Sequence, residues 1–278
     1  MTRTMTWTAA NGEETVLDGS TGITLLHGSL GLEAPNPANI IDEYTGFDGG
    51  ALVHRRNPVR LIGLGLYLNH PTRIETRVAE LAALIRGPGQ LTWADDTFTR
   101  TLRQVIYETG IDGSGITTPT ERVLSVSLVA LDPWWYGPTE SRDLVVGVEH
   151  TAFSAAIGFS SLLPFNGGGT ESVPITGDAD AYPVFTITGP ATTLVVGSGG
   201  ASWEIAAALP AGETLVVDHR PTSRGPRLNG GPADWANITE ASRLFTMSAG
   251  LTTIISGSTG TTGATVVNVS WEPRYLTP

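Results

Sequence analysis

The sequence predicts a mainly β protein with one α-helix in its N-terminal half and a second half built of strands alone. Four observations carry this prediction. Short apolar segments recur along the chain, turn dipeptides such as Asn11-Gly12 and Asp18-Gly19 separate them, and 34 glycines and 18 prolines favour frequent turns. A helical apolar period occurs in one place, between residues 72 and 86.

The first strands are predicted at residues 5–8, 14–17 and 23–32. Asn-Gly and Asp-Gly tolerate positive φ, so both dipeptides fit hairpin turns between these strands. Residues 33–39 are predicted to form a loop. The Gly-rich region 44–57 is predicted to be an exposed excursion from the fold.

The strongest strand signal of the first half lies at residues 59–68, where apolar residues occupy both alternating faces. We therefore expect a central strand that is covered on both faces. The helix follows: Thr72 and Glu75 form a capping-box pattern, apolar residues recur at i, i+4, i+7 and i+11, and Gly87-Pro88 ends it. Such a stripe packs on a sheet far more often than it binds a cofactor, so we expect it in the core.

A hairpin over residues 91–107 and a strand over 122–131 complete the first half. Proline lacks an N–H donor and restricts the residue before it, so an Asp-Pro pair ends that strand. Three aromatic residues follow the pair. We interpret this stretch as a domain hinge whose rings join two modules; the alternative is a loop within one domain whose rings fill a core. The stretch comprises Asp132, Pro133, Trp134, Trp135 and Tyr136.

The second half contains strand candidates separated by Gly- and Pro-containing turns. Their spacing indicates an antiparallel sandwich or a jelly roll. The chain accordingly divides into a first domain of residues 1–138 and a second of residues 139–278. The candidates are residues 143–148, 182–188, 193–196, 202–205, 214–218, 251–255 and 265–271.

Charge and composition exclude several classes of function. The net charge of −11 argues against binding nucleic-acid phosphates, which takes clustered positive charge. The absence of cysteine excludes disulfides, thiol catalysis and cysteine-bound metals. No segment approaches the roughly 20 consecutive apolar residues of a transmembrane helix. The N-terminus lacks the apolar segment of a signal peptide, so we expect synthesis in a cytoplasm and no membrane insertion.

A search for chemistry finds no catalytic, cofactor-binding or metal-binding set. The five histidines lack ligand spacing. Asp178-Ala179-Asp180 lacks the Gly and Glu that complete a calcium loop, so a turn is the better interpretation. Two tryptophans of the second half, Trp203 and Trp235, are candidates for stacking on sugar rings. The alternative is that Trp203 alternates into the core and Trp235 packs a loop.

The order of features along the chain points to one known family. The features are an early strand pair with a Gly-rich turn (residues 17–28), Asp48-Gly49 before a hydrophobic strand, a helix that begins near Pro71, the Asp-Pro-Trp-Trp-Tyr stretch at 132–136, a Tyr182-Pro183 strand and a Gly-Glu-x-Leu-x-x-Asp segment at 212–218. In this order the chain resembles the distal tail proteins of bacteriophages with long, non-contractile tails. The Asp-Pro-Trp-Trp-Tyr stretch is its most specific element.

The resemblance implies an N-terminal belt domain, similar to a split barrel, and a C-terminal β-sandwich similar to galectins and carbohydrate-binding modules. The belt domains of six chains would form a homo-hexameric ring, single or stacked, around the tail-tube axis. The ring would join the tail-tube protein to the tail-tip hub at the distal end of the virion tail, and in some phages it carries receptor-binding proteins.

No catalysis and no cofactor are implied by the resemblance. The ring would enclose the DNA path without specific nucleic-acid binding, and acidic walls suit this because they repel phosphate. Three alternatives stay open: a carbohydrate-binding sandwich protein that aids attachment to the host surface, a glycan hydrolase, and a tail-like particle encoded in a bacterial genome.

Overall fold

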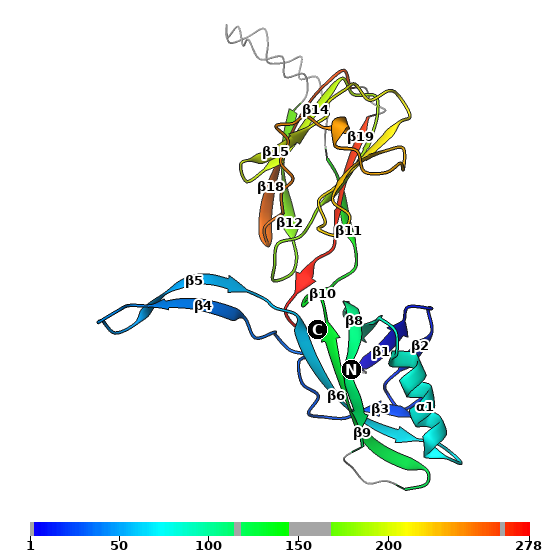
Figure 1. Cartoon of the computed structure of the whole chain (residues 1–278). Coiled ribbons are helices and arrows are strands. Elements are labelled where there is room, and N and C mark those ends of the chain that lie inside the picture. The colour runs from blue at the N-terminus through cyan, green and yellow to red at the C-terminus, as the bar shows by residue number, and fades with distance from the viewer. Residues whose placement is uncertain (1–2, 114–117, 145–167, 262–264) are drawn as a thin grey trace, which may run out of the picture. The chain divides into compact units, whose positions relative to one another are not determined.

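The computed structural model describes residues 3–113, 118–144, 168–261 and 265–278 (Figure 1). The chain divides into two compact units: the first unit is Met1–Gly137 with Tyr275–Pro278, and the second unit is Pro138–Arg274. The chain therefore leaves the first unit after Gly137 and returns to it for its last four residues. We keep the two-domain division as a proposal, with these last residues assigned to the first unit.

The first unit is built on an antiparallel sheet that curls into a nearly closed barrel. Its main path has the order β2-β1-β7-β8-β9-β6-β3, and the short strand β10 pairs with β8 and with β20. The strands are β1 (Thr4–Ala9), β2 (Glu14–Val16), β3 (Ile23–Leu25), β6 (Arg60–Asn69), β7 (Gly89–Ala94), β8 (Thr99–Asp112), β9 (Glu121–Ala130), β10 (Trp135–Tyr136) and β20 (Arg274–Tyr275).

The strand predicted at residues 23–32 is too long. After Leu25 the chain leaves the regular ladder and meets β6 again through an isolated bridge between Leu30 and Gly63. The other strands predicted for the sheet of the first unit are confirmed, with shifts of a few residues at their ends.

Strand β6 lies between β9 and β3, but its two faces differ. Ile62 is 1% exposed on the face toward the core, whereas Leu61 is 62% exposed on the other. The expectation that both faces are covered is therefore wrong. The outer face carries Gly63 and Gly65 between its apolar residues, and glycines give a strand little side chain to bury.

Helix α1 (Ile74–Ile85) packs its apolar stripe into the core, as predicted. The predicted capping box is wrong, because the N-cap is Arg73 and its side chain makes no capping hydrogen bond. Glu75 thus comes two positions after the N-cap, one short of the box spacing. Instead, Nδ1 of His70 accepts hydrogen bonds from the backbone N–H groups of Thr72 (3.3 Å) and Arg73 (3.1 Å).

Strands β4 (Ala38–Glu43) and β5 (Gly50–Arg56) pair with each other in a two-stranded hairpin, which we call the arm. Figure 1 shows the arm extending away from the sheet of the first unit. Exposure of residues 44–57 is confirmed, but the predictions of a loop at 33–39 and of an exposed excursion at 44–57 did not include these strands. Their apolar residues come in adjacent pairs, Ile40-Ile41 and Leu52-Val53, which breaks the alternation expected of a half-buried strand.

The second unit is a β-sandwich of two antiparallel sheets, as predicted. Their strand orders are β11-β19-β13-β16-β17 and β12-β18-β14-β15. Phe185 on β13 and Trp203 on β15 bring the two sheets together in the core, with ring centroids 5.4 Å apart. The strands are β11 (Glu140–Leu144), β12 (Gly168–Ile175), β13 (Val184–Thr188), β14 (Thr193–Ser198), β15 (Ala201–Glu204), β16 (Thr214–Asp218), β17 (Gly225–Leu228), β18 (Gly250–Thr259) and β19 (Val266–Trp271).

Two strands of the second unit escaped prediction. Strand β12 begins with two glycines and β17 contains Pro226, and both residue types normally argue against a strand. The strand predicted at 143–148 is seen in part as β11, and residues 145–148 lie outside the described residues.

Candidate functional sites

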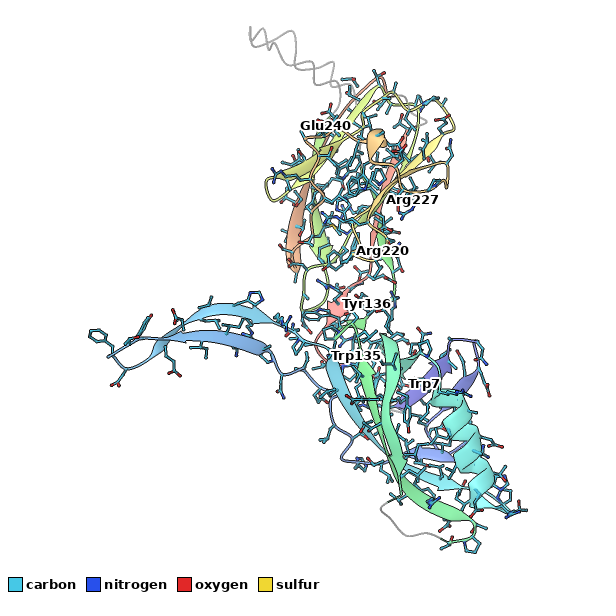
Figure 2. The ribbon with its side chains drawn as sticks, viewed as in Figure 1. Trp7, Trp135, Tyr136, Arg220, Arg227 and Glu240 are labelled. Atoms are coloured by element: carbon cyan, nitrogen blue, oxygen red, sulfur yellow. The ribbon has the colours of Figure 1, made fainter. Side chains whose placement is uncertain are left out.

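The aromatic stretch at residues 132–136 is anchored in the first unit (Figure 2). Trp135 is fully buried, and its indole N–H donates to the Leu32 carbonyl at 3.1 Å. The Asp132 carboxylate accepts from the Trp134 backbone N–H (3.2 Å) and from the Tyr136 hydroxyl (2.6 Å). These contacts fix the segment just before the chain enters the second unit. A hinge role for residues 132–136 stays a prediction.

Arg60 occupies the buried face of β6 and is 1% exposed. The five N–H groups of its guanidinium make six N···O contacts of 2.5–3.2 Å, all to backbone carbonyls: one to each residue of 31–33, two to Pro133 and one to Leu276. Burial lowers the pKa of Arg60 to about 10, against the opposing charges of Glu33 and Asp132, so the group stays protonated at neutral pH.

Sequence reasoning missed Arg60, although a signal was present. The residue shares its strand face with four leucines and isoleucines two, four, six and eight positions later. A charged residue on the apolar face of a strand indicates a buried group that must find several partners.

The arm exposes apolar side chains on both of its faces. Residues along a strand alternate between its two faces, and all of β5 and all of β4 after Ala38 are exposed, with Ile40 and Ile41 59% and 60% exposed. Phe47 in the turn between β4 and β5 is 82% exposed. The acids Asp42 and Glu43 lie toward the turn. The basic residues of β5, Arg55 and Arg56, lie at the end that joins the barrel.

A second exposed apolar surface, which we call the outer patch, lies on the barrel where the arm joins it. Leu61 belongs to it and lies on the outer face of β6. A Cβ added at Gly63 would lie 3.7 Å from the Leu30 Cβ, which puts Leu30 on the same face. Each member is about half exposed or more, and they are Leu30, Val59, Leu61 and Leu131.

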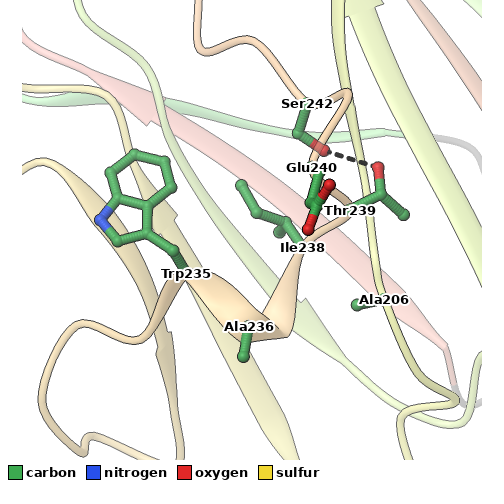
Figure 3. Close-up of a pocket in the computed structure, with 7 residues that line it drawn as sticks. All are labelled: Ala206, Trp235, Ala236, Ile238, Thr239, Glu240 and Ser242. Atoms are coloured by element: carbon green, nitrogen blue, oxygen red, sulfur yellow. Dashed lines mark hydrogen bonds between the residues drawn. The ribbon is translucent and has the colours of Figure 1, made fainter.

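The two candidate sugar-stacking residues differ in exposure. Trp203 is fully buried in the sandwich core, so neither face of its ring is available to a sugar. Trp235 is 51% exposed and begins the short 3₁₀-helix η1 (Trp235–Asn237). It lines an open depression of about 620 Å³ together with Ala206, Ala236, Ile238, Thr239, Glu240 and Ser242 (Figure 3).

Comparison with solved structures gives the architecture a precedent. The protein superposes on the crystal structure of Dit from phage SPP1 over 99% of both chains, with a TM-score of 0.71 and 14% sequence identity. The chain has the Dit fold. A chain of the phage P2 baseplate in its activated conformation with Ca matches over 100% of both chains, with a TM-score of 0.54 and 11% identity.

SPP1 Dit is described as a paradigm of the hub adsorption apparatus in phages that infect Gram-positive bacteria. No family model matches the present sequence, and no curated protein matches it significantly. At these identities the comparison establishes the Dit fold, and the assembly and partners of this chain are taken up below as proposals.

Within the Dit fold, the sandwich carries a buried carboxylate, Asp218, which is 2% exposed and lies 2.7 Å from the half-exposed Arg220 guanidinium. Burial raises the pKa of Asp218, but hydrogen bonds from Arg220 and Ser223 outweigh burial and lower it below its ordinary value. The neighbouring His219 is 4% exposed, and its Nδ1 lies 2.7 Å from the carbonyl oxygen and 3.1 Å from the backbone nitrogen of Phe245. Burial lowers the pKa of His219 to about 4, so this ring is neutral at physiological pH.

Among the described residues, no group of three or more His, Asp or Glu side chains could hold a metal ion. Asp178 and Asp180 do not form such a group; the Asp180 carboxylate accepts from Thr246 Oγ1 at 3.2 Å. In the part of the chain that the structure describes, none of the helices has the length and apolarity to span a bilayer.

Proposed function

We propose that this protein is the ring-forming adaptor at the distal end of a phage tail. Six copies assemble through their first units into a ring around the tail axis. The ring joins the tail-tube protein to the tail-tip hub and offers its outer surface to receptor-binding proteins. The full-length Dit fold and the motif order along the sequence support this function, and the exposed arm carries the assembly step.

The arm supports assembly because it lacks the partners that a hairpin needs. A two-stranded hairpin is at best marginally stable in water, and large exposed apolar patches mark interfaces. Both faces of the arm are exposed and carry apolar residues, so a partner that packs on one face covers only half of its apolar surface. In a closed ring, neighbouring copies on both sides of the arm cover its two faces.

The outer patch is the surface we assign to the arm of the neighbouring copy. Arm and outer patch are different surfaces of one unit, so their contact is head-to-tail and closes only by rotational symmetry. Acids toward the tip of the arm and arginines at its root also suit this contact, since the tip of one arm then approaches the basic root of the next. The same charges disfavour arms that pack side by side in register.

The proposed role is structural and non-catalytic. The net charge of −11 suits a ring through which DNA passes, because acidic walls repel phosphate and prevent adhesion. The fold alone does not assign chemistry, and the role rests on the assembly surfaces named above.

The test is the mass of the full chain in solution by light scattering, followed by negative-stain imaging of the same peak. We expect a mass of six chains, or twelve for stacked rings, with a central hole. Phe47→Asp in the arm and Leu61→Asp in the outer patch should each reduce the mass to that of one chain. Leu251→Asp, at a residue of the sandwich that is 68% exposed, is the matched control and should leave the ring intact.

If the protein is a monomer both alone and with purified tail-tube protein, the ring proposal is wrong. If Leu251→Asp dissociates the particle and the arm variant does not, the interface lies in the second unit instead.

A further inference from the structure

The indole of Trp235 is held in place from one side. A Cβ added at Gly225, whose φ is +136°, would lie 3.6 Å from the indole Cε2 and Cζ2 and 3.2 Å from the Ala233 Cβ. Glycine thus lets the ring lie close to the backbone of β17, and any side chain at this position would be strained. The ring is supported by backbone on that side and is 51% exposed elsewhere.

The loop that carries Trp235 is fixed at both ends by backbone hydrogen bonds. Before the tryptophan, Asp234 N–H donates to the Pro226 carbonyl at 2.8 Å. After it, the Asn237 carbonyl accepts from Ala206 N–H at 3.0 Å, and Ile238 forms a bridge with Ile205. The Asp234 carboxylate also caps the 3₁₀-helix by accepting from Ala236 N–H at 3.0 Å. An aromatic ring held in this way loses little freedom when a ligand stacks on it.

Polar groups line the same depression (Figure 3). Thr239 and Ser242 hydroxyls hydrogen-bond to each other at 3.0 Å, and Ser242 Oγ also accepts from Glu204 N–H at 3.0 Å. The Glu240 side chain is exposed and has no hydrogen-bond or ion-pair partner within the described ranges. Its carboxylate is an acceptor that remains available to a ligand.

We propose that the Trp235 depression binds a neutral pyranose. A pyranose has one face of C–H groups, which packs on an indole, and a rim of hydroxyls, which donate to a carboxylate. The depression holds about 620 Å³, within the range of small-ligand sites of about 300–1,000 Å³. Glu240 and the net charge of −11 disfavour anionic sugars. This inference does not depend on the ring, because every residue it uses lies in the second unit.

The experiment is saturation-transfer NMR on the full chain with four separate probes. The neutral probes are methyl β-D-galactopyranoside, methyl β-D-glucopyranoside and N-acetyl-D-glucosamine, and N-acetylneuraminic acid is the anionic probe. We expect transfer to the ring C–H protons of at least one neutral sugar, with a Kd on the order of 1 mM for so open a site, and none to the anionic sugar.

Variants assign the signal to the site. Trp235→Ala should abolish the transfer, and Glu240→Gln, which keeps the shape and removes the charge, should weaken binding about threefold to tenfold. Leu251→Ala removes an exposed apolar side chain of the second unit outside the depression and should leave binding unchanged. The Tm of each variant is measured alongside; if Trp235→Ala unfolds the sandwich, Trp235→Phe replaces it and should bind more weakly than the parent protein.

Two results overturn the proposal. One is the absence of saturation transfer from the folded parent protein to any of the three neutral sugars. The other is equal transfer in the parent and in a folded Trp235 variant. Stronger transfer to the anionic sugar contradicts the role given to Glu240. A cross-link from residue 235 to another protein without any sugar binding identifies the depression as a protein-docking surface.

Discussion

Replacing Arg60 by methionine should selectively destabilise the first unit. Methionine keeps an unbranched, apolar side chain on the buried face of β6 but removes all of the donors. Five backbone carbonyls in three segments, residues 31–33, Pro133 and Leu276, then lose their guanidinium partner. Arg60 itself is 1% exposed, so water does not readily replace it.

The magnitude follows from the hydrogen bonds and from the cost of burying the charge. A hydrogen bond to a charged group contributes about 1.5–3 kcal/mol, but the six contacts share five N–H groups of one guanidinium and are not additive. Removing the cation also removes its desolvation cost, which offsets part of the loss. We therefore expect Arg60→Met to lower the free energy of unfolding of the first unit by about 3–5 kcal/mol.

The assay is urea unfolding of the full chain, combined with hydrogen exchange read peptide by peptide. Peptides of the first unit, especially residues 28–34 and 131–137, should exchange faster in Arg60→Met, and peptides of the second unit should not change. Arg73→Met replaces an exposed arginine of the same unit and should cost less than about 0.5 kcal/mol. A loss below about 1 kcal/mol in Arg60→Met, the range of a surface ion pair, would refute the reasoning.

Two further predictions concern His219 and a glycine. Because burial lowers the pKa of His219 from 6.5 to about 4, the unfolded chain binds a proton in this window that the folded chain does not. The stability of the second unit should therefore be full above pH 6.5 and fall by about 3 kcal/mol on acidification to pH 4. His219→Asn, which keeps an acceptor near Phe245 N–H, should remove this part of the pH dependence in urea titrations; an unchanged acid slope contradicts the assignment. Gly31→Ala should cost about 2 kcal/mol or more, because φ is +76° and the new Cβ would meet the Leu61 carbonyl oxygen. Gly12→Ala is the control: its φ is +86°, and the new Cβ would have no atom within 4 Å, so it introduces backbone strain alone and should cost about 1 kcal/mol. Equal Tm losses for the two variants would show that the contact with the Leu61 carbonyl adds nothing.

Local patterns were sufficient for much of the fold. The helix at residues 74–85 could be predicted because its apolar residues recur with the helical period and mark the face that it buries. The helix start was wrong because the cap comes from His70, whose ring reaches two backbone N–H groups in a way that no residue spacing encodes. Strand β6 was predicted correctly, but the prediction that its outer face is buried was wrong, because glycines interrupt the apolar residues of that face.

The candidate sites were less predictable, since they depend on partners distant in sequence. Trp203 and Trp235 look alike in the sequence, yet one is fully buried and the other about half exposed. Trp203 lies on the inward face of β15, whereas Trp235 lies in the loop after β17, which backbone hydrogen bonds hold at the surface. The arm was missed because strand predictions assume one buried face, and the arm has none. Its exposed apolar residues follow no alternation of buried and exposed positions from which a strand could be predicted.

The contacts of Arg60 have a mechanical consequence. Because the second unit is inserted between Gly137 and Tyr275, a pull on it reaches the first unit through two covalent segments. Arg60 donates to Pro133 shortly before the chain leaves and to Leu276 shortly after it returns. The same cation thus shares the load between both segments, and neither can peel from the barrel without breaking bonds to the guanidinium. When the second unit is pulled in a single-molecule stretching experiment, both segments should detach from the barrel in one rupture event, at one force, rather than in two separate events.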